Sequence, residues 1–307
     1  MSILIHIAVI IGTILALWGG AVWVVESASR IAKKFGLSQL VIGLTVVAIG
    51  TSAPEFAVSI SAALTGKLSI SVGNVVGSNI FNLGIILGFV AILSSVKTDK
   101  SLLYRDGSLL VIVGFILLIF FYDLELSLFE GILLVATLII YIFMLLRSKK
   151  PIDEEIPEGD FTWKDIPMLI IGIGLIVGGA HYLVESAANI ARHFGISEWM
   201  IGITIVAAGT SIPEFATSVV AIIKGRHGIS IGNLIGSDIF NLLGVLGVAS
   251  IIRPLEISQS DYYSVIILSA YLVVLFAMMR FRWQIGKVEG TILILLAIFR
   301  WWIATVI

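Results

Sequence analysis

Two glutamates stand inside apolar stretches that are long enough to cross a lipid bilayer. Glu55 and Glu214 each follow a Gly-Thr-Ser-x-Pro sequence, and their surroundings repeat, because 43–59 reads GLTVVAIGTSAPEFAVS and 202–218 reads GITIVAAGTSIPEFATS. A charged side chain at the bilayer centre costs about 2.5–3.5 kcal/mol even on the lenient insertion scale, so such residues usually mark function. The matching pair predicts one buried cation site to which each copy contributes half.

The next apolar stretch after each glutamate carries a stripe of polar residues spaced four apart. The stripes are Asn74, Ser78 and Asn82 in the first copy, and Asn233, Ser237 and Asn241 in the second. This spacing places each set on one face of a helix. The glycines beside the stripes form GxxxG pairs, Gly73 with Gly77 and Gly232 with Gly236, which predict close packing of backbones.

The proline before each glutamate predicts a broken helix. Pro54 has no amide hydrogen and clashes with the carbonyl four residues earlier, and Gly50 eases the break. At membrane depth a break is tolerated only where the freed backbone groups line a cavity or are buried in protein. We therefore expect carbonyl ligands from Ala48 to Thr51 and from Ala207 to Thr210. Carboxylate, carbonyl, amide and hydroxyl oxygens without His or Cys suit Ca²⁺ rather than zinc or copper.

Each of these residues also has a structural interpretation. Ser52 and Glu55 have the spacing of a capping box, although a cap near the middle of a bilayer would be costly. The polar stripes are also suited to helix–helix hydrogen bonds, which is the favoured role for Asn74 and Asn233. For Ser78, Ser237, Asn82 and Asn241 we favour a ligand role.

Three more titratable residues are left without an assigned function. Glu26 and Glu185 match across the repeat but stand near the ends of their apolar stretches, and Glu26 is spaced to pair with Arg30 one turn later. We expect both glutamates at the membrane interface. His181 has no counterpart, since the matching residue is Val22, and we expect a structural or interfacial histidine.

Composition places the chain in a membrane. It is 59% hydrophobic and 13% charged, has a mean hydropathy of +1.11 and contains no cysteine, which excludes disulfides and thiolate chemistry. Its apolar stretches predict ten membrane spans. They are 3–28, 39–64, 69–94, 104–122, 127–147, 166–190, 198–223, 228–251, 262–280 and 287–306.

The spans divide into two halves of five. We predict a first repeat over 1–147, an acidic linker over 148–165 and a second repeat over 166–307. Five is an odd number, so the second repeat enters the membrane inverted, a common transporter construction with substrate bound near the midplane. The expected fold is an all-α membrane protein of two inverted five-helix repeats, with its second and seventh helices broken.

The basic residues predict the orientation. If loops alternate between sides, fifteen of the 19 Lys and Arg residues fall on one side and four on the other. The four are Lys67, Arg192, Arg253 and Arg300. Because the richer side is cytoplasmic, both termini are expected outside the cell and the linker inside.

At the doubled motif the sequence resembles the calcium/cation antiporter superfamily, which includes the sodium/calcium exchangers. The resemblance lies in GTSAPE with GNVVGSNIFN and in GTSIPE with GNLIGSDIFN, and with the ten-span layout it covers nearly the whole chain. Only 148–165 stands where animal exchangers have a large regulatory domain, so a minimal, prokaryotic form is implied. Some relatives carry an acid at the positions of Asn82 or Asn241. In this chain both residues are amides, so we expect only two carboxylates in the core.

The resemblance implies a ligand set. Glu55 and Glu214 would coordinate Ca²⁺, helped by Thr51 and Thr210 and by the carbonyls of Ala48 and Ala207. The counter-ion sites would be lined by hydroxyl and amide side chains, namely Ser52, Ser211, Ser78, Ser237, Asn82 and Asn241. Sliding of the first and sixth spans across the core would expose the site to one side at a time, a motion inferred from the family and from Gly19, Gly20, Gly178 and Gly179.

The expected function is antiport of Ca²⁺ against Na⁺ or H⁺ across the cell membrane. Two desolvated carboxylates repel one another, and one Ca²⁺, two protons or a few Na⁺ ions would neutralise them. The GTS-x-PE motif resembles the sodium/calcium branch of the superfamily more than its plant-type, proton-coupled branch, so Na⁺ is slightly favoured over H⁺. A cation channel is a weaker alternative, and an intramembrane hydrolase weaker still, because no HExxH or Ser/His/Asp set is present. Beyond the bilayer and the transported cations, no enzyme activity, cofactor, nucleic acid or protein partner is expected.

Overall fold

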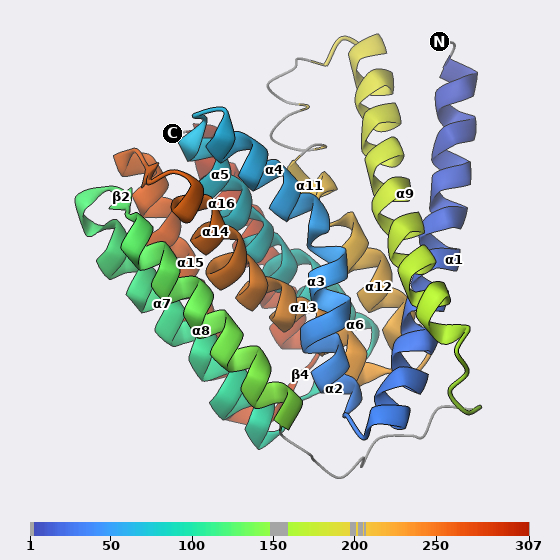
Figure 1. Ribbon diagram of the computed structural model, residues 1–307. Helices are drawn as coiled ribbons and strands as arrows, with labels where there is room; N and C mark the ends of the chain where they lie inside the picture. The colour runs from blue at the N-terminus through green and yellow to red at the C-terminus, as the bar shows by residue number, and fades with distance from the viewer. Residues whose placement is uncertain (1–2, 148–158, 197–200, 202–204, 206, 307) are drawn as a thin grey trace. The chain divides into compact units, whose positions relative to one another are not determined.

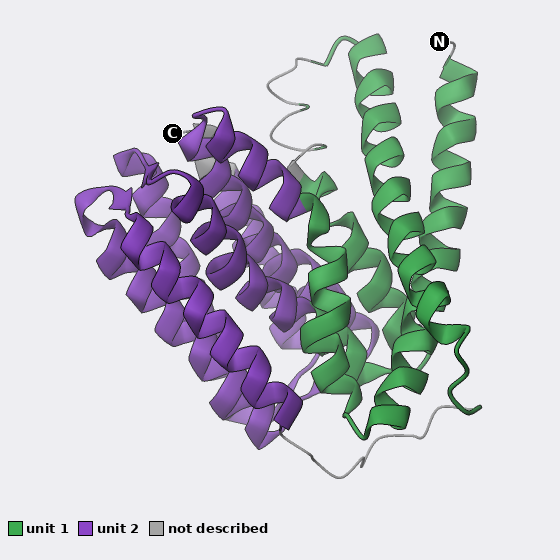
Figure 2. Cartoon of the chain, viewed as in Figure 1, with its two compact units in different colours: residues 1–54, 148–233 green, residues 55–147, 234–307 purple. Residues whose placement is uncertain are grey.

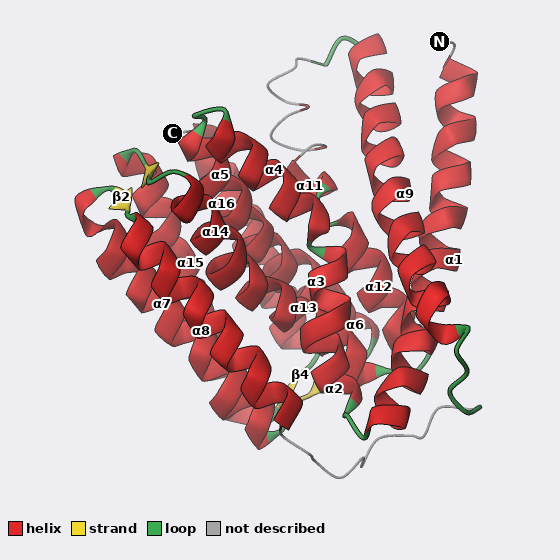
Figure 3. Cartoon of the chain, viewed as in Figure 1, coloured by secondary structure: helices red, strands yellow, loops and turns green. Residues whose placement is uncertain are grey.

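The computed structural model describes residues 3–147, 159–196, 201, 205 and 207–306, and nearly all of them are helical (Figures 1 and 3). Within the described ranges, seven helices are long and apolar enough to cross a membrane, and the bent pair Gln39–Thr51 and Ala53–Leu64 makes an eighth if it is one span. These eight match predicted spans. Of the other two, 287–306 is a 20-residue helix, and 198–223 falls partly outside the described residues, with Ile212–Ile223 as its second part.

The helices group into two compact units that interleave along the chain (Figure 2). Unit 1 comprises residues 1–54 and 148–233, and unit 2 comprises 55–147 and 234–307. Each unit takes helices from both halves of the sequence, so the compact units are a different division from the predicted repeats. The boundaries fall at the two motifs, because Glu55 begins unit 2 and Asn233 ends the second segment of unit 1.

The secondary-structure elements described in unit 1 are all helices. Its elements are α1 (Ile3–Phe35), α2 (Gln39–Ile42), the π-helical η1 (Gly43–Val47), α3 (Ala48–Thr51), α9 (Asp165–His193), α11 (Ala207–Gly209), α12 (Ile212–Ile223) and most of α13 (His227–Ile239).

Unit 2 adds two small sheets to its helices. Its elements are most of α4 (Ala53–Leu64), α5 (Leu68–Phe81), the π-helical η2 (Asn82–Ile86), α6 (Leu87–Leu93), β1 (Val96–Lys97), the π-helical η3 (Leu102–Gly107), α7 (Ser108–Phe120), the 3₁₀ turn η4 (Phe121–Asp123), β2 (Glu125–Leu126), α8 (Leu128–Arg147), the π-helical η6 (Phe240–Val245), α14 (Leu246–Ile252), β3 (Leu255–Glu256), α15 (Gln259–Arg282), β4 (Gln284–Ile285) and α16 (Lys287–Val306).

Within unit 1, α1 and α9 pack along one another with backbone contact between glycines. A Cβ added to Gly20 would lie 2.8 Å from the carbonyl oxygen of Gly172, and one added to Gly172 would lie 2.9 Å from that of Gly20. Gly179 also packs tightly, against Leu17. Gly19 and Gly178 have no described atom within 4 Å of an added Cβ. Only part of the predicted glycine set therefore lies in the interface.

Loops that the basic residues assign to one side lie together in the structure. In unit 2, β1 pairs with β4, joining two loops predicted to be cytoplasmic, and β2 pairs with β3, joining two predicted to be external. These pairings agree with the alternation of loops on which the orientation argument depends.

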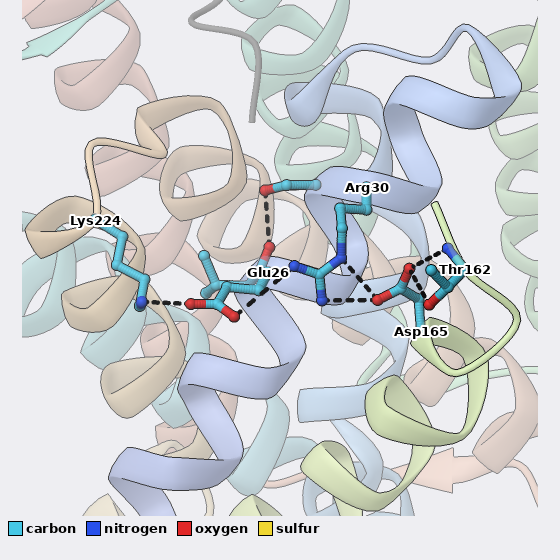
Figure 4. Close-up of polar contacts among 7 residues, drawn as sticks. Glu26, Arg30, Thr162, Asp165 and Lys224 are labelled. Carbon is cyan, nitrogen blue, oxygen red and sulfur yellow. Dashed lines mark hydrogen bonds and ion pairs between the residues drawn. The ribbon is translucent and has the colours of Figure 1, made fainter. Parts of the chain in front are cut away.

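A chain of charges ties three elements of unit 1 together (Figure 4). Lys224 Nζ lies 2.6 Å from Glu26, Glu26 lies 3.9 Å from Arg30, and both Nε and Nη2 of Arg30 lie 2.7 Å from Asp165 Oδ1. The other carboxylate oxygen of Asp165 accepts from the Thr162 backbone N–H at 2.8 Å. The expected Glu26–Arg30 pair is confirmed. The shorter contact, between Glu26 and Lys224, joins residues 198 positions apart, so the spacing of residues in the sequence could not predict it.

We expect Asp165→Ala to destabilise the protein more than Lys224→Ala does. Asp165 is only 2% exposed, so its loss leaves the Arg30 guanidinium half-buried without its main counter-charge, at a cost of about 2 kcal/mol or more. The Lys224–Glu26 pair is at the surface, where such pairs contribute less than about 1 kcal/mol. Thermal unfolding followed by tryptophan fluorescence would rank the variants, and equal melting temperatures would contradict the ranking.

Candidate cation site

The helix break predicted at the first motif is present. The chain bends by 49° between α3 and α4, and Ser52, with φ −80° and ψ 9°, separates the two helices. Pro54 has no N–H to offer the carbonyl of Gly50, four residues earlier. The carbonyl of Ala48, however, accepts a hydrogen bond from the Ser52 N–H at 3.0 Å. The expectation that the break frees the Ala48 carbonyl is therefore wrong.

The second motif has the same local form where it is described. The short α11 ends at Gly209, Ser211 takes φ −90° and ψ 5°, and α12 begins at Ile212 with a proline in its first turn. Residues 202–204 and 206, and the side chain of Ala207, lie outside the described part. The two glutamates thus occupy equivalent places, each in the first turn of the helix after the break.

In unit 1 the carboxylate of Glu214 is fully buried beside hydroxyl groups. The Ser52 hydroxyl donates to Glu214 Oε1 at 2.9 Å. The Thr51 hydroxyl donates to Asn233 Oδ1 at 2.9 Å. The Thr210 hydroxyl is buried and has no hydrogen-bond partner among the described residues. Unit 1 therefore places Thr51, Ser52, Thr210 and Glu214 among the buried oxygen groups that the sequence predicts.

Asn74 and Asn233 make equivalent hydrogen bonds in their own units. In unit 2, Asn74 Nδ2 donates to the backbone carbonyl of Glu55 at 3.2 Å and to Ser59 Oγ at 2.9 Å. In unit 1, Asn233 Nδ2 donates to the carbonyl of Glu214 at 3.4 Å and to Ser218 Oγ at 3.0 Å. Each asparagine fixes the turn that carries a glutamate. The helix–helix role predicted for both is confirmed.

In unit 2 the rest of the stripe forms a buried polar cluster. Asn82 Nδ2 donates to Asp238 Oδ1 at 3.1 Å, and Asn79 Nδ2 donates to the Asp238 backbone carbonyl at 3.2 Å. Asn241 Nδ2 donates to Ser78 Oγ at 3.3 Å and to Asn79 Oδ1 at 3.1 Å. Among the described residues, the amide oxygens of Asn82 and Asn241 have no hydrogen-bond partner, although both are buried.

Asp238 corrects the prediction that the core holds two carboxylates. It is fully buried, as are Glu55 and Glu214, so the described core of the motifs holds three acids. The signal was present in the sequence, since GSDIFN has Asp238 where GSNIFN has Asn79. It was missed because the residue stands one position after Ser237, outside the i, i+4, i+8 spacing.

The Ser52 hydroxyl donates to the carboxylate of Glu214, and Ser211 makes no side-chain capping hydrogen bond to α12. Ion binding and capping by Ser52 need not exclude each other, because a hydroxyl that donates can also accept. A capping box does occur at the exposed start of α15, where Ser258 and Asp261 bond reciprocally. Ser237 is also buried, and Glu185 and His181 are exposed, in keeping with the interfacial interpretation of the last two.

The buried groups are suited to a hard cation. Carboxylate, amide and hydroxyl oxygens dominate among them, and such oxygens are the ligands that hard cations prefer. A helical membrane protein with buried acids at helix breaks belongs to the class of secondary transporters with discontinuous helices.

The family follows from comparison with known proteins. The model of the sodium/calcium exchanger protein family matches residues 5–147 and 164–306, once for each half of the sequence. The chain belongs to this family. It is therefore a multi-pass membrane transporter of the calcium/cation exchanger type, an antiporter and not an enzyme.

Individual relatives cover almost the whole chain. The putative antiporter CaxA of Alkalimonas amylolytica is 36% identical, over 94% of this chain and 95% of its own. The sodium/calcium exchanger MaX1 of Methanosarcina acetivorans is 34% identical, over 90% of this chain and 91% of its own. A solved structure of the sodium–calcium exchanger NCX_Mj, soaked without Na⁺ and Ca²⁺, superposes with a TM-score of 0.87 over 100% of both chains at 30% identity. The predicted fold class and family are confirmed.

We expect Gly232→Ala to destabilise the protein, whereas Gly73→Ala at the matching position should not. A Cβ on Gly232 would lie 2.6 Å from the Leu40 carbonyl oxygen and 3.0 Å from the Gly43 Cα, so α13 and the α2–η1 segment must separate, at about 1–3 kcal/mol. A Cβ on Gly73 meets no described atom within 4 Å, and because the residues equivalent to the neighbours of Gly232 lie outside the described part, the close packing of the first GxxxG pair stays a prediction.

Thermal stability of the two variants in detergent, measured by the loss of monodisperse protein on heating, would compare them. Gly73→Ala should be neutral or slightly stabilising, because alanine is the better helix former. An unchanged melting temperature for Gly232→Ala would show that the close contact carries no energetic weight.

Proposed function

We propose that the protein exchanges Ca²⁺ for Na⁺ across the cell membrane by alternating access, with Glu55 and Glu214 as the Ca²⁺ carboxylates. The observation that carries the proposal is the equivalence of the two glutamates. Each is fully buried, each lies in the first turn after a helix break, and each has its backbone carbonyl bound by an asparagine at the same offset. Burial of a carboxylate costs free energy, and the same burial at two equivalent places supports a shared ligand.

The proposed ligand set follows from which oxygen groups are buried. Thr51 and Thr210 would assist the carboxylates, and the hydroxyl and amide groups would bind counter-ions, namely Ser52, Ser211, Ser78, Ser237, Asn82 and Asn241. Each of these side chains except that of Thr210 is buried, and the hydroxyl oxygen of Thr210 is buried too. The Ala48 carbonyl, which accepts from the Ser52 N–H, would bind the cation with its second lone pair. Ala207 remains proposed by analogy with Ala48.

Neutralisation of the carboxylates supplies the coupling. Empty, the acids carry net negative charge in a medium of low dielectric constant, where an unneutralised ion is strongly disfavoured. Either Ca²⁺ or several Na⁺ ions remove that charge. If the protein changes its access only when the charge is neutralised, the movement of one ion requires the return of the other.

Sodium is favoured over protons as the counter-ion. Hydroxyl and amide oxygens are ligands of the type that binds Na⁺. Protonation of the carboxylates would not need these buried groups. Two relatives, MaX1 and NCX_Mj, are named as sodium–calcium exchangers. We further propose that both termini face the outside of the cell, that 148–165 is a cytoplasmic linker, and that 1–147 and 166–307 are the two repeats.

Ca²⁺ transport into proteoliposomes tests the coupling. With Na⁺ loaded inside the vesicles and none outside, we expect rapid ⁴⁵Ca²⁺ uptake, because Na⁺ leaving the vesicle drives Ca²⁺ entry. With a pH gradient alone, uptake should stay near that of protein-free vesicles. The reverse pattern would establish proton coupling, and rapid flux that needs neither gradient would favour a channel.

Glu55→Gln and Glu214→Gln test the site. Each substitution removes one of the two charges proposed to bind Ca²⁺ while keeping the shape, so we expect uptake to fall by at least about 100-fold. Glu185→Gln is the matched control, since Glu185 also has a counterpart across the repeat but is exposed, and its uptake should remain within about twofold of the parent. Undiminished uptake by either folded site variant would refute the assignment.

A further inference from the structure

The two small sheets of unit 2 occupy matching positions in the repeat but carry opposite charge. At the repeat offset of 159 residues, 96–106 corresponds to 255–265, and 279–289 corresponds to 120–130. The segments around the β1–β4 sheet, 96–106 and 279–289, hold six basic and three acidic residues, a formal charge of +3, and we call them the basic corner. The segments around the β2–β3 sheet hold five acidic residues and no basic one, a formal charge of −5. The same pairing of strands thus forms with either sign of charge, so the pairing itself does not require the cations.

The acids of the basic corner are all engaged within the fold. Asp106 is 0% exposed, and its two carboxylate oxygens accept from the Arg105 guanidinium at 2.6 and 2.9 Å and from the Tyr141 hydroxyl at 2.9 Å. Asp99 and Glu289 each accept a backbone N–H, at 2.7 and 3.0 Å. Four exposed basic residues of the corner form no ion pair among the described residues, namely Lys97, Lys100, Arg280 and Lys287. The corner therefore presents positive charge to its surroundings.

Arg280 is positioned by two aromatic rings. Its guanidinium carbon lies 5.3 Å from the centre of the Trp283 ring, and the Tyr104 ring meets Trp283 edge-on, with the ring centres 6.0 Å apart. Trp283 has a left-handed φ of 54°, and Leu124 at the matching position has one of 65°. Both corners therefore share the left-handed turn, whereas Phe121 stands where the basic corner has Arg280. An arginine stacked on a ring is oriented in advance and keeps its N–H donors available to an anion.

The basic corner lies at the end of a membrane-spanning helix. The 24 residues of α15, Gln259–Arg282, make about 36 Å of helix, enough to cross about 30 Å of hydrocarbon and to bring Arg280 to the level of the lipid headgroups. Trp and Tyr side chains concentrate at this level, and Tyr104 is 52% exposed. Phe281, which is 91% exposed, offers an apolar surface to acyl chains. The anion always present here is a lipid phosphate, and lipids of net negative charge complement the corner best.

We propose that the basic corner binds the headgroup of an anionic phospholipid, with the Arg280 guanidinium on the lipid phosphate and Trp283 and Tyr104 holding that guanidinium in place. The three exposed lysines strengthen the attraction. On the proposed orientation the lipid belongs to the cytoplasmic leaflet, and the proposal does not depend on which ions are exchanged. The simpler alternative is that these cations only orient the chain in the membrane, a role that needs no defined geometry.

The thermal stability of the purified protein in a nonionic detergent tests the proposal. We expect dioleoylphosphatidylglycerol to raise the melting temperature more than dioleoylphosphatidylcholine does, because a ligand of the folded state stabilises it. Arg280→Gln should raise the phosphatidylglycerol concentration that gives half of this shift at least about fivefold. Trp283→Leu keeps every charge and introduces the residue type of the matching Leu124, and it should raise that concentration about threefold or more. Arg253→Gln, at an exposed arginine next to the β2–β3 sheet, is the control and should match the parent.

Several results would overturn the proposal. Equal stabilisation of the parent by the two lipids would exclude an anionic lipid as the ligand, and the same shift from inorganic phosphate would make the ligand a soluble anion. An unchanged lipid effect in folded Trp283→Leu, or an equal loss in Arg253→Gln, would leave only a diffuse attraction. If neither corner variant folds, Arg280→Lys, which keeps the charge without the planar donors, should bind phosphatidylglycerol more weakly than the parent. Equal affinity would then overturn the proposal.

Discussion

Burial of negative charge in a medium that cannot solvate it is the constraint on which the structure depends. Glu55, Glu214 and Asp238 are all fully buried, in a chain with a mean hydropathy of +1.11. Carboxylates in such surroundings persist only with donors, counter-charges or bound cations close by. The helix breaks and polar stripes of both motif copies provide donors and oxygen groups at the required places, and long apolar helices supply the frame.

The same constraint explains why asparagines are so frequent near the acids. Asn74 and Asn233 fix the turns that carry Glu55 and Glu214, in the same geometry in each unit. Asn241 donates to Ser78 and Asn79, and Asn79 and Asn82 both donate to Asp238. An amide donates to one partner and still offers an oxygen to another, so these residues can hold the helices together and coordinate an ion. The structural and functional interpretations of the stripes are therefore compatible.

The sequence was sufficient to predict the fold class and the burial of Glu55 and Glu214 after helix breaks, because hydropathy and an internal repeat are both visible in a single chain. It was insufficient where a side chain's role depends on distant partners. The Lys224–Glu26 pair and the bond from Ser52 to Glu214 both depend on how helices pack. Asp238 was missed for a different reason, since a strict four-residue spacing hid an acid adjacent to the stripe.

The central claim is that a divalent cation is bound by the carboxylates of Glu55 and Glu214. Anomalous diffraction from crystals grown with Sr²⁺ in place of Ca²⁺ would test it most directly, because Sr²⁺ takes the same oxygen ligands and scatters anomalously. The account predicts one strong peak within coordination distance of carboxylate oxygens from both glutamates, and its loss at high Na⁺. A peak bound to neither glutamate, or the same peak in Glu214→Gln, would contradict it.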